Sequence, residues 1–409
     1  MNQLTGADAL VKMLHIYDVK YIFGLCGDTS LPFYDALHRL GHGIKHILCR
    51  DERSASYMAD GYARTTGKVG ICEGPSGGGA TYIAPGLVEA NESSIAVLGI
   101  TTDISIGSRG RYSLTELDQE SLFRPLTKWN KMVERADQLP HLMRTAFYEM
   151  TTGTPGSAHL GLPFDVQREP VDDNDVWADP CFGRFPAHCQ APEESAVERC
   201  YELILKAKNP IIICGGGPLL AGAESELATL SETLKIPVCT SISGKGIMSD
   251  DHPMSVGVIG SNGGVNETRG ILGHADLIIF IGCRAGSVTT ERWQHPSPGQ
   301  KKMIHIDTNS KVIGANYPTE LAIIADARLT IKELNRVVRR ETPNVSERGL
   351  SAEFIAKKKR LKYRAFNNLA KCNEFPIRPE RIVAELNELL PPDAIIVADP
   401  GTPCPYFSA

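Results

Sequence analysis

The amino-acid sequence predicts an α/β protein with two doubly wound, mostly parallel sheet domains, followed by a helical linker and the start of a further domain. Three observations predict this class. Short apolar strands alternate with amphipathic helices over residues 1–167, and the alternation returns over residues 193–338. Between them, residues 168–192 are rich in proline and aspartate, as linkers are. The chain has 409 residues, of which 42% are hydrophobic, enough for two or three globular domains.

The first domain, residues 1–167, is expected to begin with repeated strand–helix units. Three short apolar runs are predicted to be strands, at 19–23, 44–48 and 69–72. Two segments are predicted to be helices, at 31–40 and 54–64. Right-handed crossovers should wind these units into an open sheet with helices on both faces. The second domain, residues 193–338, repeats the pattern, with strands expected at 211–214, 236–240, 277–281 and 303–307 and the clearest helix at 221–235.

The last segment, residues 339–409, is expected to be a helical linker followed by an incomplete domain. Its basic run at 357–364 is interpreted as a solvated helix face rather than a nucleic-acid site. A helix is predicted at 379–390, and a strand that is apolar on both faces at 394–398. Such a strand needs parallel neighbours and covering helices, so we expect a further segment or another chain to pair with it.

Composition and charge exclude several classes of protein. The net charge of −5 leaves no electrostatic footprint for nucleic acid. The longest apolar runs, 210–214 and 277–281, are far too short to cross a bilayer, and the first residues lack the charged and apolar regions of a secretory signal. The 11 cysteines are scattered, without the spacing of a zinc site, so we expect a cytoplasmic protein that itself holds no metal.

Two motifs of the first domain follow predicted strands, where open α/β sheets place ligands. The first, Arg50-Asp-Glu-Arg-Ser-Ala55, brings Glu52 to the start of a helix, although the helix dipole alone also favours an acidic residue there. The second, Gly74-Pro-Ser-Gly-Gly-Gly-Ala-Thr81, is a turn whose backbone could approach a ligand closely and present N–H groups to an anion. A tight packing turn explains it equally well, and it lacks the Gly-Lys-Ser/Thr of a Walker loop.

The second domain carries weaker signals of a nucleotide site. Gly215, Gly216 and Gly217 follow a predicted strand, but their spacing is not that of a dinucleotide fingerprint. Gly282 and Arg284 follow another predicted strand, at a position where a ligand could bind. The alternative interpretation is that the glycines only form turns, and that the polar residues at the strand ends only hydrogen-bond within the protein.

Taken together, these motifs resemble those of the thiamine-diphosphate (ThDP) enzymes, in the superfamily of acetolactate synthases and 2-keto-acid decarboxylases. The motifs that match the family's pyrimidine-binding (Pyr) domain are Phe23-Gly-Leu-Cys-Gly27, residues 50–64, residues 77–81, Asp118-Gln-Glu120 with Thr127-Lys128, and residues 153–166. The second domain resembles the family's Rossmann-like central domain at residues 215–217, 244–246 and 282–284. Residues 395–402 look like the opening of the diphosphate-binding (PP) domain.

The resemblance implies a role for each matching residue. In this family the glutamate that matches Glu52 bonds to N1′ of the cofactor's aminopyrimidine and favours its imino tautomer. Gln119 matches a polar residue near the reacting carbonyl, and Cys26 and Gly27 match positions beside the pyrimidine. The turn whose backbone approaches the cofactor matches Gly77 and Gly78. The positions that hold FAD in synthase relatives match Gly215, Gly216, Gly217, Gly282 and Arg284, which makes FAD a second ligand to consider.

The match has departures. Cys26 stands where many relatives have proline, and Tyr82 replaces an asparagine. Asp118 stands where the synthases have an apolar residue that lines the substrate pocket. This difference argues against acetolactate synthesis as the specific reaction. No Gly-Asp-Gly with a downstream asparagine occurs, the motif that in the family holds Mg²⁺ and the cofactor's diphosphate.

The resemblance therefore implies a subunit of a ThDP-dependent carboligase or decarboxylase that acts on a small 2-keto acid. The subunit is expected to self-associate and to be inactive alone, because a partner would supply the PP half-site and its Mg²⁺. That half is expected either from a separate gene product or from the missing part of a longer polypeptide. The alternative is a non-catalytic FAD- or ADP-binding regulatory subunit, against which the joint presence of Glu52, Gln119 and the glycine turn argues.

Overall fold

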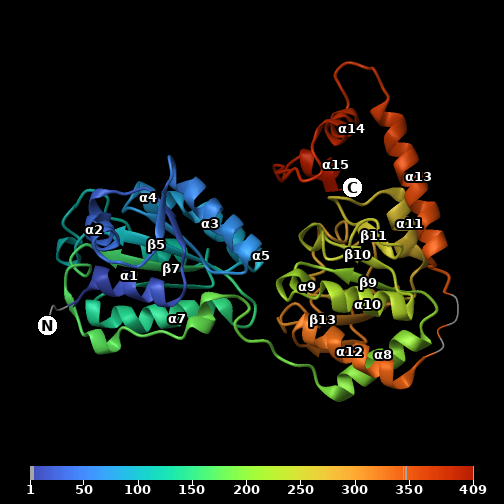
Figure 1. Ribbon diagram of the computed structural model, residues 1–409, viewed down its shortest axis with the longest axis horizontal. Coiled ribbons are helices and arrows are strands. Elements are labelled where there is room, and N and C mark those ends of the chain that lie inside the picture. Colours follow the sequence, from blue (N-terminus) through green and yellow to red (C-terminus); the bar gives the residue numbers. More distant parts are fainter. Residues whose placement is uncertain (1–3, 344, 346–347, 409) are drawn as a thin grey trace. The chain divides into compact units, whose positions relative to one another are not determined.

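The computed structural model describes residues 4–343, 345 and 348–408, and the chain divides into two compact units, residues 1–188 and 189–409 (Figure 1). Each unit contains one six-stranded sheet in which every pairing is parallel. Helices flank both sheets, which confirms the predicted α/β class.

The sheet of the first unit has the strand order β3-β2-β4-β5-β7-β6. Its strands are β2 (Tyr21–Gly24), β3 (Lys45–Leu48), β4 (Gly70–Gly74), β5 (Val97–Asp103), β6 (Trp129–Met132) and β7 (Ala158–Pro163). Its helices are α1 (Gly6–Ile16), α2 (Leu31–Arg39), α3 (Glu52–Thr66), α4 (Gly78–Tyr82), α5 (Ala84–Ser93), α6 (Gln119–Phe123) and α7 (Leu139–Thr151). Helices α1 and α7 lie together along the sheet (Figure 1). Helices α3 and α5 pack against each other.

Small residues let α3 lie close to the sheet. Ala55, Ala59 and Ala63 are fully buried at helical spacing, and the helix ends at Gly67 in a left-handed conformation. The helix begins at Glu52, two residues before the start expected from sequence, because the Asp51 side chain accepts a hydrogen bond from the Arg53 amide and caps it.

The segment expected to be a linker, residues 168–192, is structured over most of its length. β8 (Pro170–Val171) pairs with β1 (Leu4–Thr5), and the amide of Val69 donates to the carbonyl of Gly183. Residues 168–188 therefore belong to the first compact unit. Composition alone gave no signal for these long-range backbone pairings.

The second unit has the strand order β11-β10-β9-β12-β13-β14. Its strands are β9 (Pro210–Cys214), β10 (Val238–Thr240), β11 (Ser255–Val258), β12 (Leu277–Ile281), β13 (Lys302–Asp307) and β14 (Leu321–Ile324). Its sheet is covered by helices α8 (Glu194–Lys206), α9 (Gly217–Leu220), α10 (Glu224–Leu234), α11 (Asn266–His274), α12 (Ala327–Glu341) and α13 (Ala352–Ala370). Alternate residues of β9 point to opposite faces of the sheet and enter two separate hydrophobic cores. Ile212 belongs to the core formed with α8, α10 and α12, and Ile211 belongs to the core formed with α11 and α13. The helix predicted at 221–235 forms as α10 but begins only at Glu224, because Gly222, with a φ of +63°, separates it from α9.

One expectation for residues 339–409 requires correction. The strand predicted at 394–398 is not formed, and Ile395 is 91% exposed in an irregular segment between α14 (Pro379–Leu389) and α15 (Pro403–Ser408). An apolar run pairs as a strand only where a neighbouring strand offers free backbone groups. The basic run lies on α13 (Ala352–Ala370), where Lys357, Arg360 and Arg364 are exposed, while Lys362 is partly buried with its ammonium near Gly257. Among the described residues, no helix has the length and apolarity to cross a membrane.

Candidate functional site

The carboxyl edge of the first sheet gathers most of the residues singled out from sequence. Glu52 follows β3, the glycine turn follows β4, and Gln119 packs against β5. Parallel strands end at this same edge, so loops that are distant in sequence converge there.

Glu52 is the first residue of α3 and is only 8% exposed. Its carboxylate makes no hydrogen bond or ion pair with any residue that the structure describes. A Cβ added to Gly79 would lie 3.0 Å from Glu52 Oε1, so the carboxylate faces the glycine turn. Neither Glu52 oxygen is among the fully buried side-chain atoms that lack a partner, so the unpaired carboxylate opens to solvent at this edge of the sheet and is free to accept a ligand.

The glycine turn contains two positions at which only glycine fits, Gly77 and Gly79. Gly77 has a φ of +70°, and a Cβ there would lie 2.8 Å from Thr115 Cβ. A Cβ on Gly79 would lie 2.5 Å from Pro75 Cδ. At Gly78 the nearest atom is a Tyr82 ring carbon at 3.8 Å, so this exposed position is open. Packing explains two of these glycines, and Gly78 leaves the backbone accessible.

The loop after β2 touches the glycine turn. A Cβ on Gly27 would lie 2.5 Å from Pro75 Cβ, which places Gly27 directly beside the turn. Cys26 next to it is exposed, and its thiol pKa is raised by partial burial and by the charge of Glu73. The loop after β2 and the glycine turn are thus brought together at this edge of the sheet.

Hydroxyl groups connect these loops. Thr29 Oγ1 lies 2.8 Å from Thr102 Oγ1 and donates to Ser76 Oγ at 3.1 Å. Ser76 Oγ in turn lies 2.7 Å from Thr115 Oγ1. This network fixes the ends of β2, β4 and β5 relative to one another, and sequence inspection missed it because serine and threonine are common in loops.

Gln119 is 1% exposed, and both ends of its amide are occupied. Its Nε2 donates to the carbonyl of Thr102 at 2.9 Å, and its Oε1 accepts from Thr101 Oγ1, which also contacts His159 Nε2. No hydrogen bond joins Gln119 to Glu52 in the part of the chain that the structure describes. The structure places Gln119 at the same edge of the sheet, with its amide already committed.

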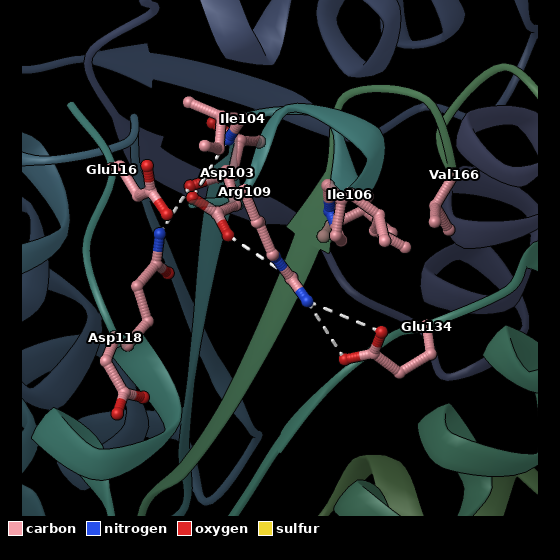
Figure 2. Close-up of polar contacts among 12 residues, drawn as sticks. Asp103, Ile104, Ile106, Arg109, Glu116, Asp118, Glu134 and Val166 are labelled. Atoms are coloured by element: carbon pink, nitrogen blue, oxygen red, sulfur yellow. Dashed lines mark hydrogen bonds and ion pairs between the residues drawn. The ribbon is translucent and has the colours of Figure 1, made fainter. Parts of the chain in front are cut away.

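The loop between β5 and α6 is held by ion pairs (Figure 2). Arg109 reaches Asp103 Oδ2 at 3.4 Å and Glu134 Oε1 at 3.2 Å. The Gly110 amide donates to Glu116 Oε1 at 2.6 Å. Asp103 ends β5 and is 2% exposed, and burial raises its pKa. These contacts hold the loop that carries Thr115. At its end, Asp118 caps α6 by accepting from the Ser121 amide at 3.0 Å.

A second buried carboxyl, Glu73, was missed from sequence. It is 0% exposed on β4 and accepts hydrogen bonds from Ser30 Oγ at 2.6 Å and Tyr34 OH at 2.8 Å. An acidic residue in an otherwise apolar run, directly before the glycine turn, was the available signal.

In the second unit, the glycines singled out from sequence pack against one another. A Cβ on Gly215 would clash with the carbonyl of Gly282, and one on Gly217 would lie 2.7 Å from Gly282 Cα. Gly216 has only ordinary contacts, the nearest at 3.5 Å. Arg284 lies within electrostatic range of Asp307, whose pKa is raised by burial. Close backbone packing thus accounts for Gly215, Gly217 and Gly282 without a ligand.

We expect Gly215→Ala to destabilise the second unit by about 2 kcal/mol, because the new methyl group meets backbone that cannot move aside. Chemical denaturation of both variants measures this, with Gly216→Ala as the matched control at an expected change within about 0.5 kcal/mol. Equal stability of the two variants would contradict this account of the glycines.

Comparison with known proteins finds two family matches and several relatives. Residues 4–122 match "Thiamine pyrophosphate enzyme, N-terminal TPP binding domain", and residues 197–334 match "Thiamine pyrophosphate enzyme, central domain". The probable acetolactate synthase large subunit of Methanococcus aeolicus is 35% identical over 94% of this chain and 64% of its own length. Its counterpart in Methanocaldococcus jannaschii is 33% identical, over 95% and 64%. The acetolactate synthase large subunit of Buchnera aphidicola is 30% identical, over 98% and 69%. The chain thus spans 64% of the length of the first two relatives.

Proposed function

The chain belongs to the family of thiamine-diphosphate-dependent enzymes, and on this premise we propose that it supplies the pyrimidine-side half of the active site of a carboligase or decarboxylase acting on a small 2-keto acid. The carrying observation is the buried carboxylate of Glu52, which has no partner among the described residues and faces a glycine turn. The names of the three relatives described above, two probable acetolactate synthase large subunits and one acetolactate synthase large subunit, support the same class of reaction.

The residues present fit the pyrimidine end of the cofactor. A ring nitrogen would give Glu52 the hydrogen-bond partner that it lacks within the described residues. The missing side chain at Gly79 leaves Glu52 Oε1 uncovered, and the open position of Gly78 exposes backbone beside it. Cys26 and Gly27 would lie beside the ring, since their loop touches the same turn.

When bound, the cofactor supplies a carbon nucleophile and an electron sink for cleavage next to the keto group. In this proposal Glu52 shares a proton with the ring nitrogen at its carboxyl oxygen, which the glycine turn leaves uncovered. Thr115 covers Gly77, and the Arg109 contacts hold its loop in place. Gln119 keeps the end of β5 in position through Thr101 and Thr102, and its approach to a substrate carbonyl would require one of these bonds to open.

The diphosphate end and Mg²⁺ are proposed to be held by a partner polypeptide. The family matches cover the N-terminal and central domains, and the remaining length of the relatives lies outside the aligned region. The apolar and exposed residues Ile395, Ile396 and Val397 are a surface that such a partner could cover. For FAD, the packing of Gly215 against Gly282 gives no specific support, so we do not extend the proposal to it.

Mixing the chain with a candidate partner that carries the Gly-Asp-Gly and downstream asparagine motif tests this proposal. With thiamine diphosphate, Mg²⁺ and pyruvate, we expect CO₂ release from the mixture and none from either chain alone. The matched control is the same partner with the aspartate of its motif replaced by alanine, which should not complement. Turnover by this chain alone would contradict the shared site, and a mixture that is inert with a series of 2-keto acids would contradict the reaction class.

A further inference from the structure

A buried histidine lies behind Gln119 and has no part in the function proposed above. His159 belongs to β7, and its side chain is 0% exposed. Its Nε2 lies 2.7 Å from Thr101 Oγ1, and the same hydroxyl donates to Gln119 Oε1. Two successive contacts thus join the neighbouring strands β5 and β7 to the first residue of α6.

The backbone carbonyl of Thr102 fixes the orientation of the Gln119 amide. A carbonyl can only accept a hydrogen bond, so the end of the amide that lies 2.9 Å from the Thr102 oxygen is the nitrogen. The amide oxygen therefore faces Thr101, whose hydroxyl has a single proton. Because that proton is used in the bond to Gln119 Oε1, the Thr101 oxygen can only accept from any other group.

This count of protons assigns the tautomer of His159. Nε2 carries a proton and donates it to the Thr101 oxygen. Nδ1 of the neutral ring is then bare, and it is a buried atom with no hydrogen-bond partner among the described residues. A proton on Nδ1 would have no acceptor there, and the tautomer that carries it would also lose the bond to Thr101. Burial agrees with a neutral ring, because it lowers the pKa of His159 to about 3.

The ring of His159 also contacts the far end of α6. It stacks on Phe123, the last residue of this helix, with the ring centroids 3.9 Å apart and the planes 17° from parallel. Phe123 is 0% exposed, so this contact is part of the core. The N–H of His159 thus acts on Gln119 through Thr101, and its ring face acts on Phe123. The two contacts depend on different properties of one side chain and can be separated by substitution.

We propose that His159 is a positioning residue that holds the amide of Gln119 in one orientation through Thr101. Its Nε2 proton turns the Thr101 hydroxyl toward Gln119 Oε1, which keeps the amide nitrogen at the carbonyl of Thr102. This orientation is the one from which Gln119 approaches a substrate carbonyl. Only that last role rests on the proposed function, because the hydrogen bonds belong to the chain without substrate or cofactor.

Nuclear magnetic resonance of the full chain without cofactor tests the assigned tautomer. In a sample with nitrogen-15 in its histidine rings, the signals of His159 are identified by their loss in His159→Phe. We expect the proton on Nε2, a bare Nδ1 and no titration of this ring around neutral pH. A proton on Nδ1, or an imidazolium at neutral pH, would overturn the inference.

Two variants separate the N–H of His159 from its ring. His159→Phe keeps an aromatic ring against Phe123 and removes the donor, whereas His159→Gln keeps a side-chain N–H and removes the ring. We expect the side-chain amide protons of Gln119 to exchange with solvent about tenfold faster in His159→Phe and within about twofold of the wild type in His159→Gln. His141→Phe, at an exposed position of α7, is the matched control and should not change the rate. Equal rates in the two His159 variants, or a faster rate in His159→Gln, would overturn the inference.

Thr101→Val tests the connection at its middle, because it removes the hydroxyl that joins His159 to Gln119. The exchange of the Gln119 amide protons should be faster than in the wild type. Adding His159→Phe should cause no further increase, since both substitutions break the same connection. Independent, multiplying effects of the two substitutions would show that His159 does not act through Thr101 and would overturn the inference.

Turnover of the complemented mixture tests the role at the substrate. His159→Phe should lower kcat/KM for pyruvate by about tenfold, and His159→Gln by less than about twofold, because only the first removes the donor. Wild-type kcat/KM in His159→Phe would overturn the positioning role. A wild-type mixture that fails to turn over, while the tautomer and the exchange rates are as expected, would count against the proposed function alone.

Discussion

Replacing Glu52 by glutamine is expected to reduce turnover of the complemented enzyme by at least about 100-fold, the usual loss when an acid–base group is removed. The amide has nearly the same volume as the carboxyl, so α3 and the glycine turn should keep their packing. It cannot share a proton with a ring nitrogen as a carboxyl does. Steady-state CO₂ release from the mixture with the partner chain measures the effect.

The control for this prediction is the same substitution at an exposed site. Glu89→Gln removes a surface carboxylate that pairs with Arg64 and should leave turnover unchanged. Size-exclusion chromatography of Glu52→Gln with the partner should show the assembly of the wild type. Wild-type turnover in Glu52→Gln would remove the proposed role, whereas loss of assembly would indicate a structural one.

Replacing Arg348 by methionine is expected to destabilise the second unit by about 3 kcal/mol, because it leaves buried carbonyls without a donor. Arg348 is 8% exposed, and its guanidinium donates to the carbonyls of Leu234 at 3.0 Å and Ala207 at 2.8 Å. These carbonyls lie at the C-terminal ends of α10 and α8. Carbonyl groups at the end of a helix have no intrahelical donor, and they carry the negative end of the helix dipole.

Chemical denaturation, with hydrogen exchange read at the ends of α8 and α10, measures this effect. Arg340→Met is the matched control, because Arg340 is half-exposed and pairs with Glu198 and Glu341 on the surface. Its expected change is within about 0.5 kcal/mol. Similar stability losses in the two variants would show that the buried guanidinium has no special effect.

Most of the fold followed from local pattern. The apolar runs at 211–214 and 277–281 are buried on both sides in parallel strands, and the alternation of strands with helices allowed only an open α/β sheet. The run at 394–398 has the same composition and is not a strand. The difference lies in the presence of a neighbouring strand, which a local pattern cannot report.

The sequence by itself determined the α/β class, the family resemblance and the motif around Glu52, because periodicity and motif spacing are properties of the chain. Only the tertiary structure showed that Glu52 lacks a hydrogen-bond partner among the described residues, that Gln119 is bonded at both ends, and that Glu73 is fully buried between Ser30 and Tyr34. Hydrogen bonding and burial depend on residues far apart in sequence that meet at one edge of the sheet. The protonation of a carboxyl is set by those neighbours, and the order of residues along the chain does not contain them.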